Sequence, residues 1–193
     1  MLAKYSFRTL ALATAITVTG PVWAQEIAIA IGSEPTTLDP QLRDDGGERA
    51  ITDNIFETLL ARDSDGVLSP SLAASMPSQV DATTWEVDLR DGISFHNGEP
   101  FNADAAAFSV NRIIDPEFNS EQSSFFASIT GASVVDGDTI QITTDGPDPI
   151  LPARLYWMKM VPPGAAAEED FASNPVGTGP YTFVSWDRGS SID

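Results

Sequence analysis

The clearest pattern along the chain is an alternation of apolar and polar side chains over residues 83–89. Trp85, Val87 and Leu89 fall on one face, and charged residues occupy the positions between them. Because successive side chains of a strand point to opposite faces of a sheet, this stretch is predicted to be a half-exposed antiparallel strand. Two tight turns are predicted after it, at Asp91-Gly92 and Asn97-Gly98.

Apolar residues at helical spacing predict two helices. Residues 103–114 form the first, with Asn102 at the N-cap position and Asp115-Pro116 as the stop. The polar stretch 43–48 leads into the second. Its apolar residues at helical spacing are Ala50, Ile51, Ile55, Leu59 and Leu60.

Shorter segments complete the pattern. Residues 26–31 are apolar and β-branched, which predicts a strand buried in a sheet. Residues 132–143 predict a hairpin about Asp136-Gly137, and residues 181–186 are strand-like. Short helical or ambiguous segments are predicted at residues 68–76, 153–160 and 165–170. Hairpins and helices mix without regular alternation, so the predicted fold class is α/β with a mixed α+β sheet.

The first 24 residues have the order of a secretory signal peptide. Lys4 and Arg8 supply a positive start, an apolar run begins at Leu10, and Val22-Trp23-Ala24 offers a small residue before a cleavage point. The apolar run is too short to span a bilayer. The segment therefore predicts export, and a chain without cysteine fits a bacterial periplasm. No membrane insertion is expected after its removal.

Charge narrows the range of partners. The chain carries 10 basic and 28 acidic residues, a formal net charge of −18, and the loss of Lys4 and Arg8 with the signal peptide would make it −20. Such a surface repels phosphate backbones and anionic lipid, so no nucleic-acid partner is expected. The same acidity mildly favours cationic ligands. The 42% hydrophobic content is typical of a globular domain.

Residues that could carry chemistry are few. The chain has no cysteine, which excludes disulfides, thiolate metal sites and cysteine nucleophiles, and His96 is the single histidine. We interpret His96 as a turn residue. The acidic groups Asp44-Asp45 and 168–170 could chelate calcium or act as paired carboxylates, but they lack calcium-loop spacing, and a solvated acidic face is the preferred interpretation. We expect no enzyme activity, no metal and no cofactor.

A glycine-rich stretch near the end of the chain invites comparison with phosphate-binding loops. Gly177-Thr-Gly179 lacks the third glycine of a dinucleotide fingerprint, and Pro180 removes a backbone amide that a phosphate would need. No helical pattern follows it. The stretch is therefore predicted to be a turn that aims a strand, and Trp186 to Gly189 is predicted to be a further hairpin turn, with residues 190–193 starting a return strand.

Five stretches of the chain together resemble a known family. They are "EPTTLDPQ", "IFETLL", "PSLAASM", "TWEVDLRDGISFHNGEPFNADAAAFSVNRIIDP" and "NPVGTGPYTFVSWDRGSSI". In order and spacing they are similar to the N-terminal part of the family 5 extracellular solute-binding proteins, which are the oligopeptide-, dipeptide- and nickel-binding proteins of ABC importers. The resemblance covers residues 26–192.

The resemblance implies a fold and a function. Family members have two α/β lobes that close over a ligand, and the first lobe is built from both ends of the chain. Residues 25–193 would then be an incomplete first lobe, and the second lobe would lie outside this sequence. The implied function is capture of a peptide or similar small solute by a monomeric extracytoplasmic protein that docks on an ABC permease and its ATPase. The alternatives left open are a non-binding product of a disrupted gene and a secreted hydrolase domain.

The resemblance also implies three groups of ligand-binding residues. Each group has a plainer interpretation, which is loop solvation for the acidic pair and core packing for the aromatic residues. The positions that match the family's cleft are Arg43, Asp44, Asp45 and Gly46, then Phe125 and Phe126, then Tyr156, Trp157 and Met158.

Overall fold

The computed structural model describes residues 27–193, so the signal peptide predicted over residues 1–24 lies outside the described residues. Residues 31–193 form one compact unit, and residues 27–30 belong to a separate one. None of the helices in the described part of the chain is long and apolar enough to cross a membrane.

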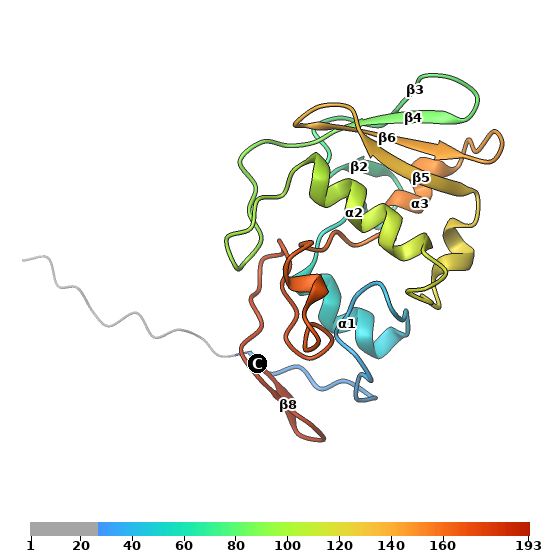
Figure 1. The fold of residues 1–193 in the computed structure, drawn as a ribbon. Helices are drawn as coiled ribbons and strands as arrows, with labels where there is room; N and C mark the ends of the chain where they lie inside the picture. The colour runs from blue at the N-terminus through green and yellow to red at the C-terminus, as the bar shows by residue number, and fades with distance from the viewer. Residues whose placement is uncertain (1–26) are drawn as a thin grey trace, which may run out of the picture. The chain divides into compact units, whose positions relative to one another are not determined.

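A four-stranded antiparallel sheet lies at one end of the larger unit, at the top of the view in Figure 1. Its strands, in spatial order, are β3 (Ser78–Gln79), β4 (Thr84–Asp88), β6 (Thr139–Thr144) and β5 (Ile129–Val134). β4 and β6 pair in register, with Trp85 opposite Ile142 and Val87 opposite Ile140, and these four side chains are buried. The alternating strand and the hairpin about Asp136-Gly137 are both confirmed.

Helix α2 (Ala103–Ile114) packs across β5 and β6, as Figure 1 shows. The Asn102 side chain accepts a hydrogen bond from the Ala105 amide at 3.0 Å, which confirms the predicted N-cap. Val110 and Ile113 are fully buried against the sheet. On the exposed side, Asn111 exchanges two hydrogen bonds of 2.8 Å with the backbone of Ala132 in β5, which fixes the helix on that strand.

Helix α1 (Gly46–Ile55) is present as predicted, but it begins inside the polar stretch 43–48 that was expected to precede it, and it ends earlier than expected. The helix was expected to continue to Leu60, yet Phe56 is extended and β1 (Leu60–Arg62) pairs with β2 (Leu68–Pro70). The Ile55 carbonyl accepts the Gly179 amide at 2.8 Å instead of an amide of the next helical turn. A distant segment therefore ends the helix. The helical turn expected over residues 68–76 is also wrong, because strand pairing with β1 takes its first residues.

The strand expected over residues 26–31 is not present in the described residues 27–31, and this expectation is wrong. Ile27 and Ile29 are 74% and 82% exposed. A strand needs a hydrogen-bonded neighbour, and no strand of residues 27–193 pairs with this segment. An apolar, β-branched composition alone therefore does not produce a strand here.

The remaining elements are short. They are η1 (Ser123–Phe126), α3 (Leu151–Leu155), η2 (Ala165–Ala167), β7 (Trp186–Asp187) and β8 (Ser191–Ile192). The predicted hairpin turn before Gly189 is confirmed, because β7 and β8 pair and Gly189 has a φ of 79°. The strand expected over residues 181–186 is reduced to its last position, since residues 181–185 pair with no strand of the described chain.

Candidate functional site

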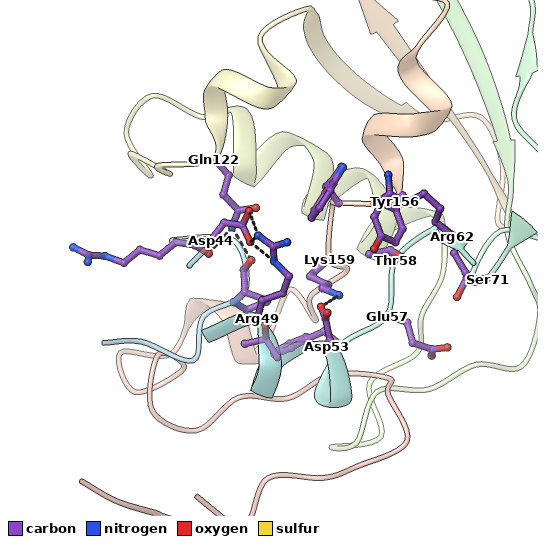
Figure 2. Close-up of a pocket in the computed structure, with 16 residues that line it drawn as sticks. Asp44, Arg49, Asp53, Glu57, Thr58, Arg62, Ser71, Gln122, Tyr156 and Lys159 are labelled. Atoms are coloured by element: carbon purple, nitrogen blue, oxygen red, sulfur yellow. Dashed lines mark hydrogen bonds and ion pairs between the residues drawn. The ribbon is translucent and has the colours of Figure 1, made fainter. Parts of the chain in front are cut away.

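A pocket of about 250 Å³ opens between α1, β1 and the segment that follows α3 (Figure 2). Two parts of the chain that are far apart in the sequence supply most of its wall, residues 40–62 and residues 156–159, and Ser71 and Gln122 complete it. The pocket exists because α1 stops at Ile55 and the chain turns into β1, so that helix and strand side chains face the same space.

Aromatic and basic side chains are stacked in one wall of this pocket. The rings of Tyr156 and Trp157 meet edge-on, with centroids 4.9 Å apart. The guanidinium of Arg62 lies 4.5 Å above the Tyr156 ring, and that of Arg49 lies 4.7 Å above the Trp157 ring. Figure 2 shows Arg62 and Tyr156 side by side. Guanidinium–ring stacking holds a flexible side chain in place while its N–H edges stay free to bind.

Most charges in the pocket are neutralised within the protein. Arg49 donates two hydrogen bonds of 2.8 Å to Asp44, one to each carboxylate oxygen. Lys159 contacts Asp53 at 2.5 Å on the opposite side, as the dashed lines in Figure 2 mark. Such bidentate and short pairs fix both partners, so Asp44 and Asp53 act first as supports for the cations.

Buried polar contacts hold the loop that carries Arg43 and Asp44. The Gln122 side-chain amide donates to the carbonyls of Pro40 at 2.8 Å and Arg43 at 2.7 Å. The Gln41 amide donates to the Ser109 and Lys159 carbonyls, each at 2.9 Å. This loop is therefore tied both to α2 and to the segment that forms the pocket's other wall, which keeps the pocket open without a ligand.

A second, more apolar pocket of about 400 Å³ adjoins the first. The two pockets share Asp44, Arg49 and Trp157 in their walls. Phe126 is fully buried there, whereas Phe125 is 53% exposed. The Arg154 side chain, paired with Asp148 at 3.0 Å, donates to the Phe125 carbonyl and so fixes the rim. The result is one continuous surface with a charged, aromatic part and an apolar part.

The structure brings six of the nine candidate ligand-binding residues to these two pockets, although Phe126 is fully buried behind the second one. Arg43, Asp44, Tyr156 and Trp157 line the first pocket, and Phe125 and Phe126 line the second. The other three serve the fold and line neither pocket. Asp45 is the N-cap of α1 and accepts the Gly47 and Glu48 amides, Gly46 is the first residue of that helix, and Met158 is fully buried in the core.

Sequence reasoning missed four residues that shape the site. Arg49 lies in α1 and Arg62 lies in β1, and the sequence did not predict that the chain leaves the helix between them. Lys159 follows the aromatic pair 156–157. Gln122 lies in a polar segment that has no periodicity. The spacing of Arg49, Asp53 and Thr52 on one helical face could have indicated a polar face for α1. Nothing in the sequence indicates that this face meets residues 156–159.

The glycine-rich stretch before Pro180 lies outside both pockets and is structural, as its sequence predicts. The amide of Gly179 donates to Ile55, and the amide of Gly177 points at Nδ1 of His96 at 3.4 Å. These amides are therefore used inside the protein and are not free to hold an anion. The described residues contain no group of three or more His, Asp or Glu side chains placed to hold a metal ion.

Comparisons with known proteins show the family to which the chain is similar. The family model described as "Bacterial extracellular solute-binding proteins, family 5 Middle" matches residues 67–193. The glutathione-binding protein GsiB of Pectobacterium atrosepticum is 33% identical over 180 residues, which cover 91% of this chain and 35% of the relative. The present chain thus spans about a third of the length of the curated relatives that it matches.

Solved structures agree with the sequence comparison. NikZ from Campylobacter jejuni, in complex with Ni(L-His), has a TM-score of 0.74 and 28% identity over 83% of this chain and 33% of its own. The periplasmic binding protein DppA from Helicobacter pylori, in complex with the peptide STSA, has a TM-score of 0.73 and 26% identity over 83% of this chain and 37% of its own. The mixed α/β unit is therefore part of a lobe of the periplasmic-binding-protein fold, which confirms the predicted fold class. The chain belongs to the family 5 bacterial extracellular solute-binding proteins.

Proposed function

We propose that this chain forms one wall of the ligand cleft in the binding component of an ABC importer, and that the component captures a peptide or a similar small solute. The observation that carries the proposal is the pair of adjoining pockets, which share Asp44, Arg49 and Trp157. One pocket offers charged and aromatic groups, and the other offers apolar surface. A short peptide needs both, because its termini are polar and its side chains vary.

Relatives support a peptide-like solute. GsiB is a glutathione-binding protein by name, and the DppA structure holds a peptide. The NikZ structure holds Ni(L-His), so the same fold also accepts a small metal chelate. No metal site is needed in the chain for such a ligand, because the chelating groups belong to the solute.

Capture in the whole protein would involve closure of a second wall over the ligand. A ligand buried between two walls stabilises the closed form, and a transporter can distinguish that form from the open one. The pockets of the present chain are open to solvent on one side, so this wall alone makes only part of the contacts. We therefore propose that it sets where the solute lies, and that most of the affinity requires closure.

Export would bring the protein to the periplasm, where it would act as a monomer and dock on a permease with its ATPase. This part of the proposal rests on the charged and apolar segments of residues 1–24. Expression in a Gram-negative host with periplasmic extraction and mass measurement tests it. Cleavage after Ala24, leaving Gln25 as the first residue, is the expected result, and an uncleaved cytoplasmic product would contradict it.

Saturation-transfer NMR tests capture with the chain as it exists. Saturating the protein's methyl signals in the presence of millimolar tri-alanine is expected to transfer signal to the peptide. The Tyr156→Ala variant is expected to lose most of that transfer, while Tyr181→Ala, which changes an exposed tyrosine outside both pockets, is expected to retain it. Unchanged transfer in Tyr156→Ala, with circular dichroism showing a folded protein, would contradict the location of the site.

A further inference from the structure

Basic residues are concentrated at the first pocket, although the chain as a whole has a net charge of −18. The chain has 10 basic residues, of which Lys4 and Arg8 precede the described segment, and four of the remaining eight line this pocket: Arg43, Arg49, Arg62 and Lys159. Only three acidic residues line it, in a chain that has 28. The first pocket thus has a small excess of positive charge on a strongly acidic molecule, and this excess favours an anion there.

Three of these cations already have carboxylate partners. Arg49 is held by Asp44, Lys159 by Asp53, and Arg43 contacts Glu121 at 3.3 Å. Arg62 has no carboxylate within ion-pair distance and donates no side-chain hydrogen bond among residues 27–193. It is also the pocket's arginine stacked on Tyr156, so its position is restrained although its donors are free.

We infer that Arg62 binds a carboxylate group of the solute. A guanidinium presents parallel N–H groups that match the two oxygens of a carboxylate, and stacking on an aromatic ring reduces the entropy lost when such a pair forms. Among the four basic residues of this pocket, Arg62 is the one without a carboxylate partner in the described chain, so a solute anion placed there completes the pairing that the other three cations have internally. The preferred solutes are those that end in a free carboxylate, such as peptides with an unblocked C-terminus.

Glu57 also lines the pocket and has no cationic partner among the described residues, so its negative charge acts on any anion that enters. In Figure 2 its carboxylate points away from Arg62. A carboxylate in that position repels a second anion and so limits the anionic end of the solute to the Arg62 side of the pocket. The inference concerns that side alone, and it rests on the proposed function because it names what the same pocket recognises.

Paired peptides test the inference. The chain is titrated with N-acetyl-dialanine, which has a free carboxylate, and with its C-terminal amide, which has the same shape without the charge. Dissociation constants are measured from the indole resonance of Trp157. The carboxylate is expected to bind about fivefold tighter than the amide, as an accessible ion pair gives. Raising the salt concentration is expected to reduce the difference.

Two variants locate the effect. In Arg62→Gln the preference for the carboxylate is expected to vanish. Arg188→Gln is the matched control, because Arg188 also stacks on an aromatic ring, 3.8 Å from the centre of the Trp186 ring, but lies outside the pockets. It is expected to keep the preference. Equal affinity for the two peptides in the unchanged protein, or a preference that survives Arg62→Gln, would overturn the inference while capture itself stands. Absence of binding by either peptide would overturn the inference and the proposed function together.

Discussion

The imidazole of His96 donates a hydrogen bond from Nε2 to the Gly179 carbonyl oxygen at 2.8 Å. The same residue receives the Gly177 amide on Nδ1 and donates its own backbone amide to the Gly177 carbonyl at 2.9 Å. Both ring nitrogens therefore contact backbone groups of the glycine-rich segment. The single histidine of the chain is thus a connection between the turn after β4 and the glycine-rich segment, which in turn ends α1.

Replacing His96 is expected to destabilise the fold without altering the pockets. In His96→Phe the Gly179 carbonyl loses its partner, and the free energy of unfolding should fall by about 1–3 kcal/mol. Urea denaturation measures the change. His96→Gln, whose side-chain amide can still donate, is expected to recover part of it. An unchanged denaturation midpoint in His96→Phe would show that the connection contributes nothing.

Gly179→Ala is expected to be more damaging than a typical surface substitution. A Cβ at this position would lie 2.6 Å from the Asn54 carbonyl oxygen, and one at Gly177 would collide with the Ile55 carbonyl. Backbone atoms cannot move aside as a flexible side chain can, so a loss of about 3 kcal/mol or more is expected. The control is Gly146→Ala, where an added Cβ meets nothing within 4 Å. Equal thermal stability of the two variants would contradict the close approach.

Two exposed aspartates should affect stability in opposite directions. Repulsion by the Asp91 carboxylate raises the pKa of Asp138 above its ordinary value of 3.8, with desolvation adding to it. The ionised form is therefore disfavoured in the folded state, and Asp138→Asn should raise the urea midpoint at neutral pH. As the pH falls below 3.8, Asp138 is protonated in both states and the gain should disappear.

Asp81 should behave in the reverse manner. A hydrogen bond from the Thr83 amide lowers its pKa from 3.8, so the ionised carboxylate stabilises the folded state above that value. Asp81→Asn should lower the urea midpoint at neutral pH, and the loss should fade as the pH falls through the lowered pKa. Parallel denaturation series for the two variants measure both effects. Changes of the same sign at neutral pH would contradict this assignment of causes.

Calorimetry of the purified 193-residue chain with tri-alanine is expected to show no binding of micromolar strength. Only one wall of the cleft contacts the peptide here, and both pockets are open to solvent. The entropy lost on association is then opposed by few buried contacts. A dissociation constant in the micromolar range or tighter would mean that this wall supplies most of the affinity, contrary to the proposed role of closure.

The parts of the fold that sequence predicted well are those set by local chemistry. The alternation ending at Leu89, the N-cap Asn102 and the turn at Asp136-Gly137 are each determined by neighbouring residues, and each is confirmed. The failures share a different cause. The end of α1 at Ile55 depends on an amide more than a hundred positions away, and residues 27–31 lack a pairing partner among the described residues.

The candidate site was also predicted only in part, because distant contacts decide which residues reach the pockets. The resemblance to the family pointed to Asp44 and Trp157, which line both pockets, but it also pointed to Asp45 and Met158, which cap a helix and fill the core. Residue type alone did not separate these roles. Arg62 could not be found from the sequence at all, because its significance comes from an aromatic ring and an absence of carboxylates that only the folded chain brings about.

The most direct test of the central claim is the indole resonance of Trp157 during titration with tri-alanine at millimolar concentration. Trp85 in the core and Trp186 in the terminal hairpin provide internal references in the same spectrum. If the adjoining pockets are the capture surface, the Trp157 signal moves in a saturable manner while the Trp85 and Trp186 signals stay in place. A Trp157 signal that does not move, or indole signals that all drift together, would contradict the assignment of these pockets as the ligand site.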